Sequence, residues 1–406
     1  MEIVCANCNT KVTTSFNLIY KYYTCFSCHS NYKFDNGINN FLDKQSNTAF
    51  PSLLKIGAKG VFNEEEYTVV SFSSRKNKEN EIWFEYNLIS PSDKRLFLIE
   101  DCGHWILEKE IDTKEITKST GLTYKGIEYR KYETGKSQES YRCGFFNYKF
   151  DSNFSHYEEY INPPFCLSIE HDDKKKYYHG EHISRDKIKK IFNIDNLRAR
   201  EGTGMVQPFY YNLTHVFTIF IIAILAITAL HIFFYSQSKE QLVYQDVFDL
   251  NQVNKKELYT DVFELKGPIA PLSIDVLSNV DNSWMTTDFA LINQETDETV
   301  YFTKDLEYYH GYSEGENWTE GSNNDEFNIC GVSEGKYKIM ILSNKDETDT
   351  NNTSLNVKIY WGKPDNWNLY VTIFIFLAIG ALLYFIKNSF ESRRWEDSYY
   401  SPYKKE

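Results

Sequence analysis

Residues 213–234 read LTHVFTIFIIAILAITALHIFF, a run of 22 residues without a formal charge. At about 1.5 Å per residue, a helix over this run is long enough to cross the roughly 30 Å hydrocarbon layer of a bilayer. Tyr210, Tyr211 and Tyr235 flank the run, as aromatic residues do at membrane interfaces. The stretch predicts a transmembrane helix, and its alternative is a buried helix of a soluble domain.

A second apolar run, residues 369–386, reads LYVTIFIFLAIGALLYFI and is 18 residues long, again without a formal charge. This length just spans a bilayer. Trp367, Tyr370 and Tyr384 lie at or near its ends, where membrane proteins carry interfacial aromatics. Two such runs in one chain predict a mostly extramembrane protein with two spans, and a buried helix is again the alternative.

Charge divides the chain and gives an orientation. The sequence has a net charge of −13, which divides into no net charge over residues 1–208, −14 over residues 236–367 and +1 over residues 368–406. Basic residues flank the spans on the outer sides of the pair: Lys187, Lys189, Lys190, Arg198 and Arg200 before the first, and Lys387, Arg393 and Arg394 after the second. In membrane proteins, Lys and Arg residues next to a transmembrane helix are enriched on its cytoplasmic side. We therefore expect a multi-pass protein of the cell membrane with both termini in the cytoplasm and residues 236–367 outside.

Four cysteines near the N-terminus form two Cys-x-x-Cys pairs, Cys5 with Cys8 and Cys25 with Cys28. Their separation of 16 residues suits a site in which four thiolates bind one zinc ion. Two disulfides or a redox pair are the alternatives. Thiolates persist in a reducing compartment, which agrees with a cytoplasmic N-terminus. We expect residues 1–45 to be a zinc ribbon with zinc as its cofactor.

The region between the ribbon and the first span is predicted to be rich in strands. Runs of Val, Ile, Phe, Tyr and Trp are separated by turn residues and predict strands over 67–72, 82–88, 95–100, 104–107, 141–147 and 165–170. A helix should follow Ser184, because this residue can cap it and Ile188, Ile191 and Phe192 share one face. We expect a β domain over residues 50–195, a basic linker over 196–212 and a cytoplasmic tail over 387–406.

Several motifs in this region, in this order, resemble the bacterial DUF4178 domain family. They are Trp83-Phe-Glu-Tyr-Asn-Leu88, Gly103-His-Trp105, Pro163-Pro-Phe-Cys-Leu-Ser-Ile-Glu170 and Tyr178-His-Gly-Glu-His-Ile183. The resemblance implies a β-barrel-like domain without established catalytic residues. It also implies that an N-terminal zinc ribbon and a membrane anchor often accompany the domain, and that its role is accessory and related to envelope stress.

The same motifs suggest an alternative interpretation in which this domain is an enzyme. Glu85, Glu100, His104 and Glu170 would form a His/carboxylate site if the fold gathered them, and such a site binds metal or moves protons. In the competing interpretation Glu85 and His104 fix turns and the neighbouring aromatics are core residues. An enzyme with this site is therefore the alternative to a non-enzymatic protein.

The acidic segment 236–367 also alternates in the manner of strands. Leu355, Val357, Ile359 and Trp361 share one face of a predicted strand, and further strands are expected over 261–265, 272–276, 289–293, 299–303, 327–330 and 335–342. Short strands without intervening helices predict a β-sandwich of the jelly-roll kind outside the membrane.

The most unusual part of this segment is a loop rich in rings and acids. We expect it to bind a ligand through Tyr309, His310, Glu314, Glu316, Trp318 and Glu320. Aromatic faces beside carboxylates suit a cationic or carbohydrate-like ligand, or a partner protein. The alternative is a hairpin whose rings cap the edge of the sandwich.

The sequence thus favours a membrane-anchored, non-enzymatic envelope protein. Its outer sandwich is expected to bind a ligand or partner, and its ribbon and β domain to recruit proteins in the cytoplasm. Nucleic acid is not an expected partner, because residues 1–50 hold only four lysines against three acidic residues.

Overall fold

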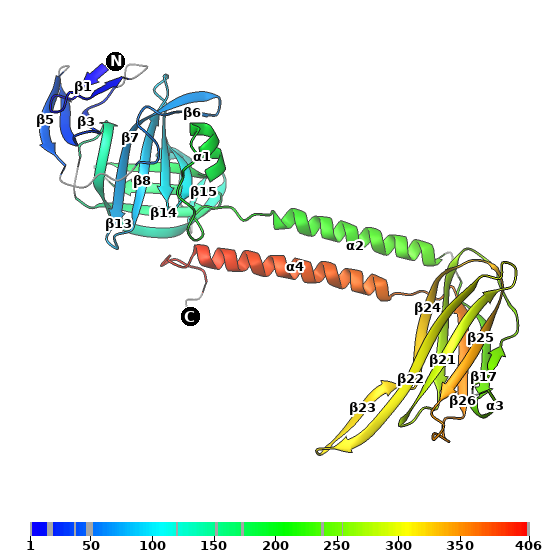
Figure 1. The fold of residues 1–406 in the computed structure, drawn as a ribbon. Coiled ribbons are helices and arrows are strands. Elements are labelled where there is room, and N and C mark those ends of the chain that lie inside the picture. Colours follow the sequence, from blue (N-terminus) through cyan, green and yellow to red (C-terminus); the bar gives the residue numbers. More distant parts are fainter. Residues whose placement is uncertain are drawn as a thin grey trace. The chain divides into compact units, whose positions relative to one another are not determined.

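The computed structural model describes residues 2–13, 19–35, 38–45, 52–118, 121–150, 153–171, 174–236, 239–253 and 255–403. The chain divides into two compact units (Figure 1). One unit comprises Met1–Asn212 with Leu382–Glu406, and the other comprises Leu213–Ala381. Each unit is described by itself.

The first unit contains a closed antiparallel barrel of eight strands (Figure 1). In order around the barrel, the strands are β7 (Glu65–Asn77), β8 (Ile82–Ile89), β9 (Arg95–Asp101), β10 (His104–Ile111), β16 (Lys175–Ile183), β15 (Phe165–His171), β14 (Ser155–Asn162) and β13 (Ile127–Phe146). The long strand β13 closes the barrel because it changes partner at Ser137, from β14 before this residue to β7 after it.

Helix α1 (Arg185–Phe192) covers part of the outer surface of the barrel. The hydroxyl of Ser184 accepts a hydrogen bond from a backbone N–H of the first turn, and Asn193 ends the helix in the left-handed conformation with φ of 51°. Ile188 and Phe192 are buried against the barrel. The helix predicted after Ser184 is confirmed.

Short elements cover other parts of the barrel. Strand β6 (Lys59–Phe62) pairs with β7 beside α1, and the hairpin of β11 (Ile116–Lys118) and β12 (Leu122–Tyr124) follows the short helix η1 (Thr113–Glu115) and joins β13. Leu167 and Tyr177 are buried under this hairpin. Both apolar layers therefore lie on the outer face of the strands.

The N-terminal segment continues the barrel sheet. Its strands are β1 (Glu2–Val4), β2 (Lys11–Thr13), β3 (Tyr22–Thr24), β4 (Ser30–Asp35) and β5 (Ile38–Lys44). Strand β3 pairs with the end of β13, where Thr24 lies opposite Gly144, so β3, β4 and β5 extend the same sheet. Tyr23 and Tyr32 form part of the small core between them.

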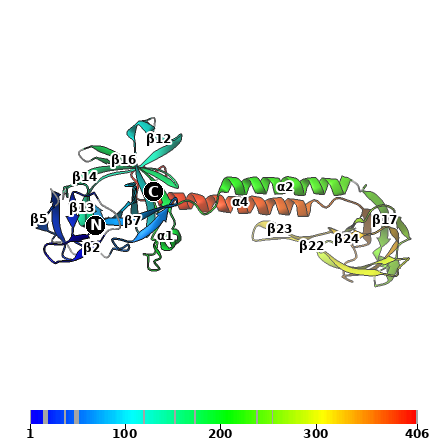
Figure 2. The same cartoon turned by 90° about the horizontal axis from the view of Figure 1, so that it is seen from above.

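The second unit begins with α2 (Leu213–Ser236) and includes the first part of α4 (Trp367–Arg394). These helices lie side by side (Figure 2), with the rings of Phe220 and Phe376 5.1 Å apart. Both are long and apolar enough to cross a membrane. The two predicted spans are thus found as helices, and α4 extends beyond the predicted end at residue 386.

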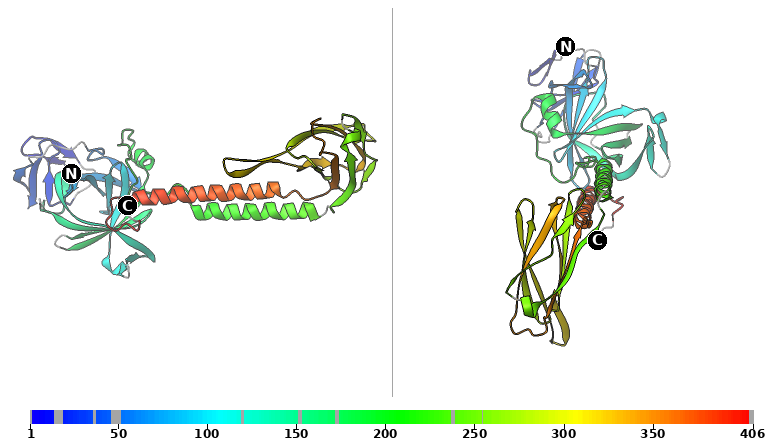
Figure 3. Two further views of the ribbon diagram at one scale, coloured as in Figure 1. Left: turned by 90° about the horizontal axis from the view of Figure 1, so that it is seen from below. Right: turned by 90° about the vertical axis from the view of Figure 1, so that its right-hand side faces the viewer.

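The residues between these two helices in the sequence fold into a two-layer β-sandwich (Figure 3). One sheet has the order β17 (Gln241–Asp249), β26 (Ser354–Trp361), β20 (Ala270–Ser278) and β24 (Asn324–Val332). The other has β18 (Glu257–Tyr259) and β19 (Phe263–Leu265) on β25 (Gly335–Lys345), then β21 (Ser283–Asn293), β22 (Thr299–Ser313) and β23 (Glu316–Ser322). The short helix α3 is Leu250–Val253.

This strand order is that of a jelly roll. If β18 and β19 count as one strand and β23 is set aside as an extension of β22, the sheets follow the orders 1-8-3-6 and 2-7-4-5. Alternate residues of β26, from Leu355 to Trp361, are buried between the sheets, as the alternation in the sequence predicted. The mostly β fold with two apolar helices is therefore confirmed.

Candidate functional site

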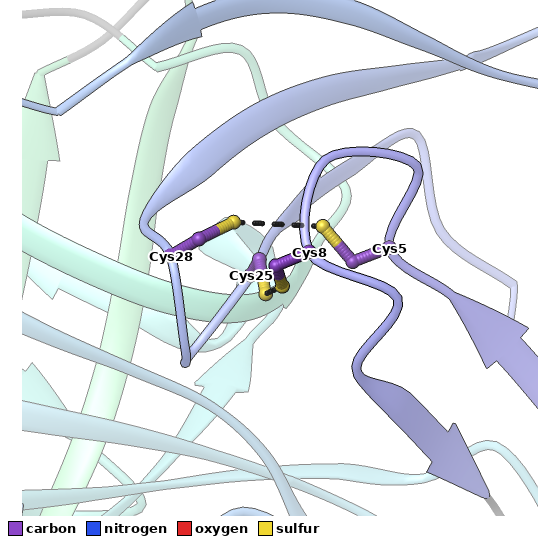
Figure 4. Close-up of side chains that lie close together, drawn as sticks. All are labelled: Cys5, Cys8, Cys25 and Cys28. Carbon is purple, nitrogen blue, oxygen red and sulfur yellow. Dashed lines mark hydrogen bonds between the residues drawn. The ribbon is translucent and has the colours of Figure 1, made fainter.

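The four cysteines predicted to bind zinc lie together (Figure 4). Their sulfur atoms are all within 4.8 Å of one another, with 3.5 Å between Cys5 and Cys28 and 3.7 Å between Cys8 and Cys25. Four thiolates at about 2.3 Å from a central zinc ion are about 3.8 Å apart in a tetrahedron. The cysteines are free thiols, so the structure does not support the disulfide alternative.

Two equivalent turns bring these sulfur atoms together. The N–H of Asn9 donates to the carbonyl of Cys5 at 2.8 Å, and the N–H of His29 donates to the carbonyl of Cys25 at 2.9 Å. Asn9 and His29 both have φ of 59°, so each knuckle turns back through the left-handed region. The repeated turn aims both pairs at one point.

Neighbouring side chains prepare the cluster for a cation. The hydroxyl of Tyr32 lies 3.2 Å from Sγ of Cys5, and the hydroxyl of Ser30 lies 3.3 Å from Sγ of Cys28. Burial raises the pKa of Cys25 to about 12, whereas hydrogen bonds from Ser30 and Asn7 outweigh burial and lower the pKa of Cys28 to about 5. The four sulfur atoms thus form a cluster that could hold one metal ion.

The interior of the barrel is polar, which the sequence did not indicate. Nη1 of Arg75 on β7 lies 2.9 Å from Oε1 of Glu170 on β15, although β13 and β14 separate these two strands in the barrel. The rings of Trp83 on β8 and Tyr157 on β14 are 5.9 Å apart, also across the barrel. Contacts between such distant strands pass through the interior.

Strand register shows which other residues face this interior. Because side chains alternate along a strand, residues that lie opposite Arg75, Trp83, Tyr157 or Glu170, and their neighbours two positions away, share the inner face. This face carries the glutamates Glu85, Glu108, Glu133, Glu139, Glu159 and Glu170. Basic residues on the same face include Arg75, Arg142 and, opposite Glu170, Lys176, and Arg142 lies over the ring of Phe150.

Carboxyl groups outnumber the basic groups on this inner face. Burial raises the pKa of Glu85 and of Glu108 to about 7, and burial with the nearby charge of Glu108 raises the pKa of Glu159 well above its usual range. Solvent still reaches the group around Arg75, because the side chains of Arg75, Glu85 and Glu170 keep 14, 21 and 25% of their surface accessible.

The other end of the interior is closed. Ile161 and Cys166 pack there against Val206 of the linker and Trp395 of the tail. The linker is held in place by Arg394, whose guanidinium donates to the carbonyls of Gly204, Met205 and Gln207 at 2.8, 2.9 and 2.5 Å. The interior of the barrel is therefore acidic, and apolar residues close it at this end.

The four residues of the alternative His/carboxylate site are not brought together. Glu85 and Glu170 share Arg75 inside the barrel. Glu100 and His104 instead belong to the turn between β9 and β10, where Glu100 accepts a hydrogen bond from the N–H of Gly103 at 2.7 Å and His104 Nε2 lies 3.0 Å from the Glu201 carbonyl. The latter pair fixes the turn and the linker.

The loop of rings and acids in the outer sandwich is a hairpin of β22 and β23 (Figure 1). Register places Tyr309 opposite Glu320 and Trp318 opposite Gly311, so three of these side chains share one face with Glu316. His310 lies on the other face, 2.7 Å from Asp281, and Glu314 lies in the turn with φ of 53°. Four of the six residues predicted here are thus neighbours.

Residues 55–185, which include all eight strands of the barrel, match the family described as "Domain of unknown function (DUF4178)". This confirms the resemblance found in the sequence. A search of curated proteins finds no match.

Some solved structures are weakly similar to the chain. One of infectious bursal disease virus Gt strain has 9% identity and a TM-score of 0.18, with 84% of this chain and 66% of the viral chain covered. A structure from work on promiscuous carbohydrate-binding modules of the β-sandwich superfamily has 7% identity and a TM-score of 0.14, with 63% of this chain and 89% of the other covered. Such scores carry no argument about this chain.

Proposed function

We propose that this chain is a membrane-anchored, non-enzymatic binding protein whose barrel takes up an organic cation with amino groups. The observation that supports this most directly is the acidic interior of the barrel, which solvent reaches at one end and apolar residues close at the other. A ligand that enters from the accessible end first meets Arg75, Glu85 and Glu170, and Glu108 and Glu159 lie toward the closed end.

The chemistry of this interior selects for positive charge. Ammonium groups gain from carboxylates and from aromatic faces, and Trp83, Tyr157 and Tyr178 lie on the inner face beside the glutamates. A bound cation would offset the repulsion between Glu108 and Glu159. Carboxyl groups outnumber basic groups there and can ionise when a cation binds, so amines rather than anions are the favoured ligand class.

We place the barrel in the cytoplasm of a membrane-anchored protein. Helices α2 and α4 cross the membrane in this proposal, and their apolar surfaces agree with it. The basic residues before α2 and at the end of α4 support an orientation with both termini inside and the acidic jelly roll outside. Cys330 is exposed on the jelly roll, so a membrane-impermeant maleimide should label it in intact cells. Labelling of Cys8 instead would reverse the orientation.

The N-terminal segment serves as a zinc ribbon in this proposal. Four thiolates leave no open position at the metal, so zinc would have a structural role. Large apolar side chains are exposed beside it, on Ile19, Phe26, Ile38, Phe41 and Leu42. Exposed apolar patches of this kind mark protein contacts, which supports recruitment of a cytoplasmic partner.

The outer hairpin is a second candidate binding site. The indole of Trp318 lies over Gly311, where an added Cβ would come within 2.8 Å of the ring, and it remains 42% exposed. Glu316, Glu320 and Tyr309 surround it on the same face. An exposed ring between carboxylates suits a sugar or a cationic group.

Ligand binding by the barrel can be tested with the full chain in detergent. Isothermal titration with α,ω-diaminoalkanes of increasing length should show saturable binding, while dicarboxylates and diols of equal length should not bind. Glu85→Gln with Glu108→Gln should weaken diamine binding at least tenfold. Glu181→Gln is the matched control, because this exposed glutamate lies opposite Leu107 on the outer face.

Equal binding by the double variant and the wild type would place the ligand outside the barrel. Trp318→Ala separates the two candidate sites, since it should leave binding unchanged if the barrel is responsible. Loss of diamine binding in Trp318→Ala alone would move the proposal to the outer hairpin.

A further inference from the structure

Two histidines and a glutamate lie together on the outer face of the barrel, away from the acidic interior. The register of β14 and β15 places His156 directly opposite His171, and their ring centroids are 4.6 Å apart. Glu158 is two residues along β14 and therefore on the same face. One ligand atom from each of the three side chains lies within 4.8 Å of the others.

A neighbouring hydroxyl holds the ring of His156 in place. Oγ1 of Thr134 lies 3.0 Å from Nε2 of His156 and 3.3 Å from the carbonyl oxygen of Tyr157. In the tautomer with its proton on Nε2, His156 donates to Thr134 and carries on Nδ1 a lone pair that can bind metal.

The carboxylate of Glu158 is oriented in a similar way. Its Oε2 accepts hydrogen bonds from Nζ of Lys131 at 3.1 Å and from the hydroxyl of Tyr160 at 2.9 Å. Its Oε1 is left facing Nε2 of His171 at 2.9 Å. Partners that orient a ligand from behind in this manner are typical of metal sites.

We propose that His156, Glu158 and His171 bind a divalent transition-metal ion of the zinc class. Two imidazoles and one carboxylate suit zinc, nickel or cobalt and do not suit magnesium or calcium, which prefer oxygen ligands. The metal takes the place of the proton between His171 and Glu158. Three protein ligands leave a coordination position for water, which distinguishes this site from the closed cysteine cluster.

The experiment counts metal ions on the full chain in detergent. Chain loaded with one equivalent of zinc should hold it in the cysteine cluster, and a titration with Co²⁺ should then add one more ion per chain. The added cobalt should show ligand-field absorption without a thiolate charge-transfer band, because its ligands are nitrogen and oxygen.

His156→Ala and His171→Ala should each lower the affinity for the added cobalt by about tenfold or more. The zinc in the cysteine cluster should remain bound. Glu158→Gln is the conservative variant, and an unchanged melting temperature shows that each variant is folded. His310→Ala is the matched control, because His310 is a partly exposed histidine of the outer domain, paired with a single aspartate. Absence of the second ion, or cobalt binding that all four variants retain equally, would overturn the proposal.

Discussion

Single residues decide the character of the barrel interior, and Glu85 is the clearest case. It lies 3.8 Å from Nε of Arg75, which Glu170 shares, and its own N–H donor is the indole of Trp83 at 3.0 Å. One guanidinium between two carboxylates cannot offset the burial of both charges. Burial therefore dominates, and the pKa of Glu85 rises to about 7.

This shift predicts how stability depends on pH. The pKa of Glu85 is about 7 in the folded chain, against 4.5 for an ordinary glutamate. Below pH 4.5 both states hold the proton, so the group has no effect. Between pH 4.5 and 7 the unfolded chain loses a proton that the folded chain keeps, so the free energy of unfolding falls as pH rises. The fall from Glu85 alone is on the order of 3 kcal/mol.

Urea denaturation of the full chain in detergent, followed at pH 5 and pH 8, measures this effect. The wild type should be less stable at pH 8 than at pH 5, and Glu85→Gln should reduce the difference. Glu181→Gln on the outer face should leave the difference unchanged. If stability rises between these pH values and Glu85→Gln has no effect on the difference, the folded chain does not raise the pKa of this carboxyl.

At the scale of elements, the sequence identifies strands with one apolar face and misses those with two polar ones. Strands such as β8 and β26 were predicted because they are rich in apolar residues, which alternate with polar residues along β26. Strand β14 was missed, because it reads SHYEEYIN and carries Tyr157 and Glu159 on the inner face with Glu158 and Tyr160 on the outer. A polar interior removes the contrast between faces on which such predictions depend.

The candidate sites follow the same division. The cysteine cluster was predicted in full, because its ligands come in pairs within short turns and the spacing alone shows the chemistry. The interior glutamates and the group of His156, Glu158 and His171 were not predicted, because only the pairing of distant strands brings them together. The pattern in the sequence that could have indicated these two sites is a glutamate or histidine at alternate positions between aromatic residues.

The junction between ribbon and barrel carries a prediction at this scale. Cys25→Ser with Cys28→Ser should reduce zinc to less than about a tenth of an ion per chain, because two thiolates hold zinc far more weakly than four. The ribbon core around Tyr23 and Tyr32 should then lose its protection from hydrogen exchange, since few apolar contacts replace the metal. Metal analysis and exchange mass spectrometry measure both effects.

Cys143→Ser with Cys166→Ser is the control for this pair, since both cysteines lie outside the cluster. It should keep the zinc. Zinc content that survives in the Cys25→Ser, Cys28→Ser variant would show that the cluster is not the metal site.

At the scale of the first unit, Arg394 joins the linker before α2 to the end of α4 beside the barrel. Arg394 is 1% exposed and donates to three linker carbonyls, and Oε2 of Glu391 accepts from its Nε at 2.9 Å. Tyr132 of β13 donates to the Arg394 carbonyl at 2.8 Å and packs on Trp395. Both connections to the apolar helices therefore meet at the closed end of the barrel.

Arg394→Met should open this junction without unfolding the barrel. The variant leaves the carbonyls of Gly204, Met205 and Gln207 without their donor, and buried unpaired carbonyls cost about 1–3 kcal/mol each. The linker should then detach, so that trypsin cuts after Arg198 or Arg200 several times faster than in the wild type. Arg393→Met is the matched control. Arg393 is exposed, so this variant should leave the cleavage rate unchanged.

If both variants are cut at the wild-type rate, the linker is held by the apolar contacts of Val206 and Trp395 rather than by Arg394. If Arg394→Met also weakens diamine binding, the closed end of the barrel and its ligand site are coupled, and occupancy of the interior can reach the helices through this residue.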